Sequence, residues 1–142
     1  MTILKKKNYE LLDFKLMGDE RGLLIPFEEN NNVPFDIKRV FYIFDTKGSI
    51  VRGNHANKNS KFLLIAINGS CTVKIDDGKE QVDFLLNRPD KGLFINNMVW
   101  KEMSEFSYNT TLIVFSNEYY NENEYIRNYD EFLKIVSNKW VK

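Results

Sequence analysis

Apolar and polar residues alternate along most of the chain, which is the period-two pattern of half-buried β-strands. The segments that show it are short and rich in β-branched or aromatic residues. We expect strands at residues 23–25, 39–44, 62–67, 70–75, 82–86, 93–95, 99–103 and 111–115. Many short strands separated by turn residues predict a β-sandwich or barrel. The jelly roll is the common single-domain form that carries a small-molecule site in its mouth.

Residues that favour turns occur at two places in the middle of the chain. Asn68 and Gly69 are able to supply both positive-φ positions of a type I′ turn, so the sequence predicts a hairpin between residues 62–67 and 70–75. Asp76, Asp77 and Gly78 mark the next turn along the chain.

The last part of the chain changes from period two to helical spacing. The acidic run 121–124 precedes a set of apolar residues spaced for one helix face: Tyr125, Ile126, Tyr129, Phe132, Leu133 and Val136. Acidic residues are favourable at the positive end of a helix dipole. The sequence therefore predicts one C-terminal helix that packs its apolar stripe on the outside of the barrel.

Size and composition fit one domain spanning residues 1–142, since we find neither an internal repeat nor a linker. Twenty basic and twenty acidic residues give zero net charge, which argues against a nucleic-acid partner. No apolar run approaches the roughly 18 residues that span a bilayer, and residues 1–7 do not begin a signal peptide, so we expect no membrane partner. The single cysteine, Cys71, lies in an apolar strand, so we expect a core residue and a cytoplasmic protein.

His55 is the only histidine, and it lies in a polar cluster just before the apolar segment 62–67. The cluster also contains Arg52, Asn57 and Lys58. On an extended segment His55 and Asn57 point to the same face, which favours a lined pocket. Single histidines are more often structural than catalytic, but a histidine near its reference pKa of about 6.5 exchanges protons at neutral pH.

The sequence gives less support for a metal site or for a serine nucleophile. One histidine and one cysteine cannot form an imidazole-rich ligand set, so we expect no metal, although a carboxylate-only magnesium site stays compatible with the composition. Ser60 and Ser70 lie outside any Gly-x-Ser-x-Gly motif. The stretch from Trp100 to Glu102 is either a second part of the pocket or a strand with Trp100 inward and Lys101 outward.

Short collinear motifs cover almost the whole chain, at residues 21–22, 28–39, 42–48, 52–58, 68–71, 76–78, 99–103 and 119–130. On these motifs the chain resembles the sugar 3,4-ketoisomerases that act on dTDP-4-keto-6-deoxyglucose, a group of cupins often labelled WxcM-like. The resemblance implies an all-β cupin jelly-roll barrel with one C-terminal helix. It also implies a homodimer, with a strand from segment 9–16 exchanged between subunits.

The resemblance implies a reaction as well. Such isomerases move the keto group of a dTDP-linked keto-deoxyhexose from C4 to C3 through an enediol, without a metal or redox cofactor. The product usually passes to an aminotransferase and ends in surface polysaccharide such as lipopolysaccharide.

The roles that the resemblance implies fall on residues of the quoted motifs. His55 is the expected principal acid/base, Tyr42 a hydroxyl near the reacting carbons, and Arg21 a contact of the sugar or diphosphate. The other expected substrate contacts are Asn57, Arg52, Lys58 and Trp100. Surface charge is an equally good explanation of Arg52 and Lys58, and core packing is the better explanation of Trp100.

Two positions depart from the family pattern. Asn57 stands where Arg-Gly-x-His-Ala-His-Lys has its second histidine, and Lys101 stands where Trp-His-Glu-Met has its histidine. An asparagine forms hydrogen bonds but does not shuttle protons near neutral pH. Three interpretations are compatible with this: His55 works alone with Tyr42 or water as relay, the substrate or product stereochemistry differs, or the domain binds a nucleotide sugar without catalysis.

Overall fold

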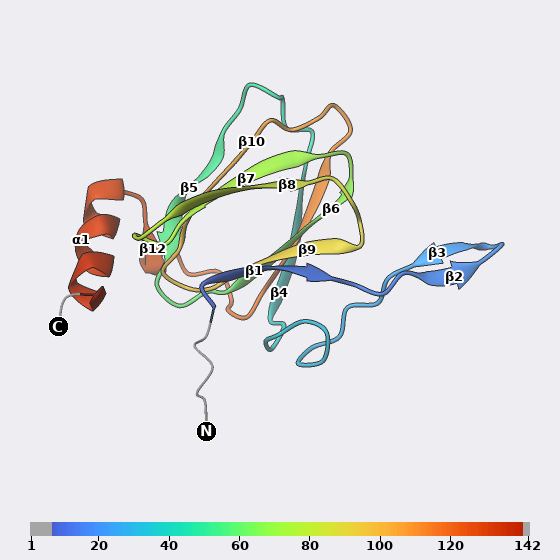
Figure 1. Ribbon diagram of the computed structural model, residues 1–142, viewed down its shortest axis with the longest axis horizontal. Coiled ribbons are helices and arrows are strands. Elements are labelled where there is room, and N and C mark those ends of the chain that lie inside the picture. Colours follow the sequence, from blue (N-terminus) through green and yellow to red (C-terminus); the bar gives the residue numbers. More distant parts are fainter. Residues whose placement is uncertain (1–6, 141–142) are drawn as a thin grey trace.

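Two five-stranded antiparallel sheets face each other in the computed structural model, which describes residues 7–140 (Figure 1). One sheet has the order β1-β9-β6-β11-β4 and the other β12-β5-β10-β7-β8. The elements are β1 (Tyr9–Asp13), β2 (Met17–Asp19), β3 (Gly22–Leu24), β4 (Arg39–Phe44), β5 (Arg52–Asn57), β6 (Phe62–Asn68), β7 (Cys71–Asp76), β8 (Gln81–Leu86), β9 (Lys91–Ile95), β10 (Trp100–Ser104), β11 (Thr111–Ser116), η1 (Glu122–Glu124), β12 (Tyr125–Ile126) and α1 (Tyr129–Trp140). The predicted strands and the predicted jelly-roll sandwich are confirmed.

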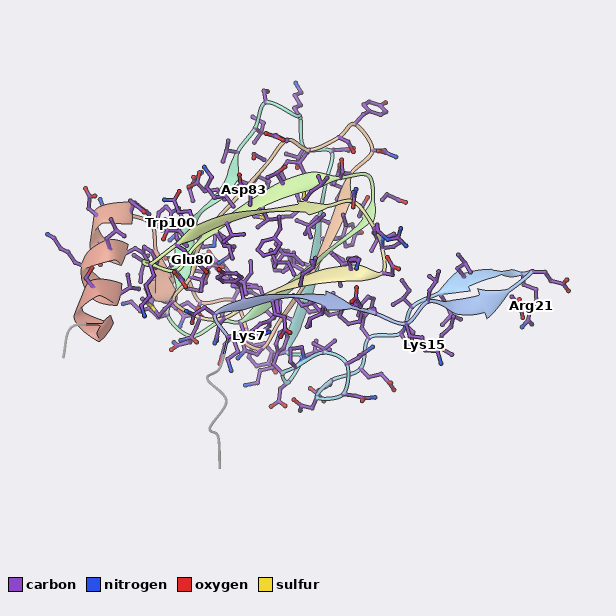
Figure 2. All side chains as sticks on the ribbon, viewed as in Figure 1. Lys7, Lys15, Arg21, Glu80, Asp83 and Trp100 are labelled. Atoms are coloured by element: carbon purple, nitrogen blue, oxygen red, sulfur yellow. The ribbon has the colours of Figure 1, made fainter. Side chains whose placement is uncertain are left out.

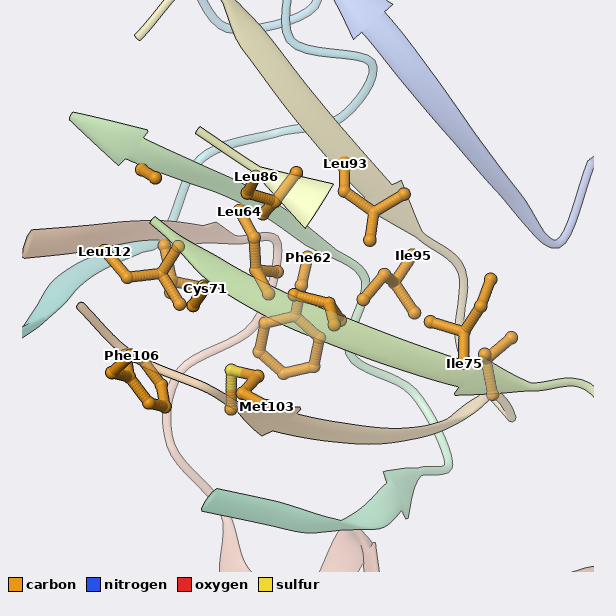
Figure 3. Packing of buried hydrophobic residues seen from close by; sticks show 14 residues of the cluster. Phe62, Leu64, Cys71, Ile75, Leu86, Leu93, Ile95, Met103, Phe106 and Leu112 are labelled. Carbon is orange, nitrogen blue, oxygen red and sulfur yellow. The ribbon is translucent and has the colours of Figure 1, made fainter. Parts of the chain in front are cut away.

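The main core fills the space between the two sheets, and both sheets contribute to it (Figure 3). Phe62, Leu64 and Ala66 of β6 point into this core, whereas Leu63 and Ile65 point to the other face and pack beneath the segment that precedes β4. Because β6 is buried on both faces, its sequence is continuously apolar. Cys71 is fully buried in the main core, and burial raises the pKa of its thiol to about 11, which confirms it as a core residue.

The predicted hairpin at Asn68 and Gly69 is wrong. β6 pairs with β9 and β11, whereas β7 pairs with β8 and β10, so the two strands belong to different sheets. Gly69 has a φ of 71° but Asn68 does not have a positive φ. A Cβ on Gly69 would lie 2.7 Å from Cα of Thr110, so glycine is required there by a close approach of the backbone as the chain crosses between sheets.

The hairpin in this part of the chain joins β7 to β8. Asp76 pairs with Gln81 across it, and Gly78 has a φ of 91° in the turn. The side chain of Asp76 accepts a hydrogen bond from the backbone N–H of Gly78 (2.8 Å), and the side chain of Asp77 accepts one from the N–H of Lys79 (2.9 Å). The turn predicted at residues 76–78 is thus confirmed and stabilised by Asx-type hydrogen bonds.

The C-terminal helix begins later than predicted. Residues 122–124 form a single 3₁₀ turn, and Tyr125 and Ile126 add a short edge strand to β5. Asn128 then caps α1, because its side chain accepts a hydrogen bond from the N–H of Glu131 (2.9 Å). As predicted, α1 packs its apolar side on the outside of a sheet, where Phe132 and Val136 contact the cluster that contains Trp100.

β2 and β3 form a separate two-stranded arm that projects from the sandwich at the end opposite to α1 (Figure 1). β1, which forms most of the segment for which strand exchange was predicted, pairs with β9 of the same chain. Exchange between subunits stays a prediction. Within residues 7–140, no helix is both long and apolar enough to span a membrane.

Candidate active site

A cavity of about 180 Å³ opens between the two sheets. Its walls are mainly apolar, and three residues on the inner side of the second sheet or at its edge bring ionisable groups to it: Arg52, His55 and Lys101. The remaining lining residues are Phe41, Ile43, Gly53, Phe62, Leu64, Met103, Val114 and Tyr125. An apolar cavity with a few convergent polar groups is the usual form of a small-molecule site.

A bulge in β5 sets the position of His55. The pairing of β5 with β10 shifts register near Lys101, and Gly53 (φ 88°) and Asn54 (φ 58°) both have left-handed backbones there. A Cβ on Gly53 would lie 2.8 Å from the carbonyl oxygen of Lys101, so this position requires glycine. The bulge turns the carbonyl of Gly53 toward His55, whose Nδ1 lies 2.9 Å from that oxygen.

The hydrogen bond to Gly53 selects the tautomer of His55. A carbonyl oxygen only accepts, so Nδ1 carries the hydrogen in the neutral ring and Nε2 is left as the basic nitrogen. The ring also packs against Tyr125, with 4.7 Å between ring centroids. The pKa of His55 is lowered to about 4, mainly by burial and then by the positive charge of Lys101, with a smaller contribution from Arg127; the hydrogen bond to Gly53 and the negative charge of Glu124 oppose this. At neutral pH His55 is therefore an unprotonated base.

Lys101 lies opposite His55 on the neighbouring strand, and only 4% of its surface is exposed. Its Nζ donates a hydrogen bond to Oδ1 of Asn57 (3.0 Å) and lies 4.5 Å from the ring centroid of Phe62. Burial lowers the pKa of the amine to about 7, against the opposing effect of the negative charge of Glu124. The interpretation that placed Lys101 outward is wrong, because Val99 and Met103 share its face and both belong to the main core.

A buried carboxylate lies behind this pair. Glu124 accepts hydrogen bonds from the backbone N–H of Ser60 (2.9 Å), from its hydroxyl (2.8 Å) and from the N–H of Asn59 (3.4 Å). Burial alone would raise the pKa of Glu124, but these hydrogen bonds hold it below its ordinary value. The η1 turn therefore presents a fixed negative charge to the interior, in the direction of Asn57 and Lys101.

The structure brings together only part of the predicted site. Arg52 lines the cavity with His55, and Asn57 is connected to it through Lys101. Lys58 is exposed and outside the lining, and its backbone N–H donates to the carbonyl of Glu124 (3.0 Å). Trp100 is buried beneath α1, on the face of β10 opposite to the cavity, and its Nε1 donates to Glu102 (3.1 Å).

Tyr42 and Arg21 also lie apart from the cavity. Phe41 and Ile43 point into it, so strand alternation turns Tyr42 to the outer face of β4, where 61% of its surface is exposed. Arg21 lies at the end of the β2–β3 arm, far from Trp100 and α1 (Figure 2), and its side chain is 86% exposed and paired with Asp19 (2.6 Å). Within one chain neither residue contributes to the cavity that contains His55.

Sequence reasoning left Lys101 as one of two alternatives for the stretch 100–102, and it missed Glu124. For Lys101 the information was available, since Val99 and Met103 flank it at period two and predict that it faces the core. Glu124 had no such indication, because its polar partners are about 65 residues away in the sequence. Among residues 7–140 no group of three or more histidine, cysteine or carboxylate side chains is arranged to hold a metal ion.

Comparisons with known proteins agree on one family. A family model described as FdtA, WxcM-like, C-terminal, matches residues 7–137. A TDP-4-oxo-6-deoxy-α-D-glucose 3,4-oxoisomerase from Aneurinibacillus thermoaerophilus is 45% identical over 128 residues, which cover 90% of this chain and 92% of that protein.

Solved structures give the same result. A 3,4-ketoisomerase from Helicobacter canadensis is 46% identical with a TM-score of 0.89, over 93% of this chain and 99% of that one. A sugar 3,4-ketoisomerase from Thermoanaerobacterium thermosaccharolyticum, in complex with TDP, is 39% identical with a TM-score of 0.91, over 94% and 98% of the two chains.

Proposed function

Since the chain belongs to the FdtA family of WxcM-like proteins, we propose that it is an isomerase that converts TDP-4-keto-6-deoxyglucose to a TDP-linked 3-keto-6-deoxyhexose. The observation that carries this proposal is the neutral imidazole of His55 in an apolar cavity, with its Nδ1 fixed by Gly53 and its Nε2 free to act as a base. A base of this kind suits proton transfer at a carbon next to a ketone.

The C4 ketone acidifies the proton on C3, and Nε2 of His55 removes it. The electrons of the C3–H bond form the C3–C4 double bond, and those of the C4 carbonyl move to its oxygen. The proton of the C3 hydroxyl passes to that oxygen by way of the enediol, and the imidazolium returns its proton to C4 as the C3 carbonyl forms. A conjugate acid with a low pKa gives up its proton readily, which favours this second step. The face of C4 that receives the proton sets the configuration of the product.

Positive charge near His55 is suited to the diphosphate of the substrate. Arg52 lines the cavity from an exposed position, and Arg127 lies over the ring of Tyr125, 4.7 Å from its centroid. Guanidinium groups bind phosphate oxygens through paired donors. An anion bound there also offsets the positive charges that lower the pKa of His55, so substrate binding makes His55 a stronger base.

We expect a homodimer in solution. The β2–β3 arm extends from the sandwich, and its Leu23 and Leu24 are 70% and 57% exposed. Apolar side chains on an extended arm are typical of a surface that a second copy covers. Arg21 lies on this arm, so a role for it at the substrate would require the cavity of the second copy.

An NMR time course with TDP-4-keto-6-deoxyglucose in deuterated buffer tests the proposed activity. We expect deuterium at C3 or C4 and a 3-keto product with the wild-type protein, and neither with a His55→Asn variant. TDP binding by calorimetry checks that the variant still folds. Binding of the sugar nucleotide without exchange by the wild type would contradict the isomerase and leave a binding domain.

A further inference from the structure

The buried amine of Lys101 lies in the cavity beside His55, and the reaction described above leaves it without a role. We propose that Lys101 is the second acid/base group of this active site, which moves protons at the oxygens on C3 and C4 while His55 moves the proton between the carbons. This inference rests on the proposed isomerase activity.

Register places the two groups side by side. Lys101 of β10 is directly opposite His55 of β5, and both residues line the same cavity. Directly opposite residues of antiparallel strands have Cβ atoms about 4.5–5.5 Å apart. Two such side chains can therefore reach adjacent atoms of one bound sugar, such as a ring carbon and the oxygen on its neighbour.

Packing alone does not explain the lysine. Its Nζ has one hydrogen-bond partner among residues 7–140, the neutral Oδ1 of Asn57, and it lies in no ion pair there. Burying an ammonium without a paired anion is unfavourable, and an apolar side chain would fill the same space without that penalty. An unpaired ionisable group in a cleft is typical of a functional site.

The proposed steps return both residues to their initial states. His55 takes the proton from C3 as the C3–C4 double bond forms, the π electrons of the C4 carbonyl move to its oxygen, and that oxygen takes a proton from the ammonium of Lys101. The neutral amine then removes the proton of the C3 hydroxyl, the C3 carbonyl forms, and C4 takes the proton from the imidazolium. The net change is the transfer of the carbonyl from C4 to C3.

The protonation states at neutral pH fit these steps. His55 must begin neutral and Lys101 must begin charged, which requires a pKa below the working pH for His55 and one near or above it for Lys101. Burial lowers the two pKa values to about 4 and about 7 respectively, so the required pair of states is populated between them. An amine with a pKa near neutrality both donates and accepts protons efficiently.

Asn57 is a positioning residue in this scheme, because its Oδ1 accepts the hydrogen bond that holds Nζ of Lys101. Asn57 and Lys101 are also the two positions at which the chain departs from the family pattern, and the structure shows that they contact each other. The two departures are thus linked. Asn57 stands where the family pattern has a histidine that could titrate beside the amine of Lys101, and its amide oxygen accepts a hydrogen bond from that amine.

The charged groups around Lys101 define how pH acts on it. β5 contributes His55 and Arg52, η1 contributes Glu124, and Arg127 follows β12. The residues that line the cavity from β4, β6 and β11 are apolar. Glu124 supplies the negative charge that raises the pKa of the amine, Arg52 and Arg127 are the positive groups nearby, and the imidazole of His55 is neutral at working pH.

The test compares Lys101→Met with a matched control, Lys74→Met, which removes an exposed lysine from the neighbouring strand β7. We expect Lys101→Met to lower kcat by about 10²–10⁴-fold with little change in the Kd for TDP, and Lys74→Met to leave both unchanged.

In the pH profile of kcat/KM, the wild type should lose activity on the basic side of neutrality. Lys101→Arg, which keeps the charge but does not titrate, should lack that loss and have low activity throughout.

Two further measurements make the outcome decisive. Nitrogen-15 NMR of the lysine side chains reports the pKa of Lys101 directly, and primary amines such as methylamine should restore activity to Lys101→Ala. Activity of Lys101→Met within about twofold of wild type, or an ordinary lysine pKa, would overturn the role of Lys101. Absence of deuterium exchange in the wild type itself would instead overturn the proposed isomerase.

Discussion

The polar groups on the two faces of strand β10 differ in how fully they are paired. On the inner face, Lys101 has one neutral hydrogen-bond partner and lies opposite His55 in an apolar cavity. On the outer face, Trp100 donates to Glu102, and nearby Tyr129 donates from its hydroxyl to Asp76. Groups on the outer face are hydrogen-bonded to complementary partners, whereas on the inner face Lys101 forms no ion pair among residues 7–140 and His55 is a neutral base. The outer groups thus stabilise the fold, and the inner groups are available for chemistry.

The largest expected effect is on the inner face, where His55→Asn removes the base. We expect kcat to fall by about 10²–10⁴-fold, because removing a positioned acid/base group has that effect. Isomerisation followed by NMR measures the change, and the melting temperature should stay close to that of the wild type. A variant that retains most of its activity would show that the proton at C3 is removed by another group.

Lys101→Met should make the protein more stable while it impairs catalysis. Replacing a poorly paired buried charge with an apolar side chain of similar size raises the free energy of unfolding by about 1–4 kcal/mol at pH 7. Urea denaturation measures this, with Lys74→Met expected to stay within about 0.5 kcal/mol of wild type. A lower stability for Lys101→Met would show that the amine is needed for packing.

The low pKa of Lys101 in the folded protein also makes the stability of the wild type depend on pH. The unfolded chain keeps the lysine protonated up to its ordinary pKa of 10.5, whereas the folded protein releases the proton above about 7. The unfolded state thus binds more protons in this window, and this contribution to stability rises as pH increases from 7 to 10.5. Lys101→Met should remove that rise, as measured by denaturation at several pH values.

More of the fold than of the site could be predicted from the sequence. Alternation located the strands, and the apolar stripe placed α1 outside the sandwich. The hairpin at Asn68 and Gly69 failed because a local turn preference carries no information about the sheet to which each strand belongs. Its glycine is needed for a close approach to Thr110, which is distant in sequence.

At the site, the sequence drew attention to His55, which lines the cavity, and to Asn57, which contacts Lys101, but it could not decide which residue of β10 faces them. Trp100 and Lys101 must face opposite sides of β10, and the aromatic residue is the usual choice for the interior. The sandwich has a second apolar environment beneath α1, which buries Trp100 and leaves Lys101 for the cavity. The low pKa of His55 was equally inaccessible, because it results from burial and from charges on other elements.

Glu124→Gln removes the negative charge behind the cavity. The negative charge of Glu124 raises the pKa of Lys101, so its removal should move the basic limb of the activity profile to lower pH. The loss of a carboxylate that accepts hydrogen bonds from Ser60 should also lower stability by about 1–3 kcal/mol. Glu122→Gln, which changes an exposed residue of the same turn, is the control. An unchanged basic limb would mean that another group is responsible for it.

The smallest effect is expected on the outer face, for Tyr129→Phe. The Tyr129 hydroxyl donates to Asp76, and this hydrogen bond, together with burial, raises the pKa of the phenol, so the ring stays neutral at working pH. Its removal should lower the free energy of unfolding by about 0.5–1.5 kcal/mol and leave kcat unchanged, because Asp76 keeps its bonds from Gly78 and Gln81. Denaturation and isomerisation assays on one preparation measure the free energy of unfolding and kcat of this variant. If kcat fell together with stability, the two faces of β10 would be coupled, and the division between stabilising and reactive groups would no longer hold.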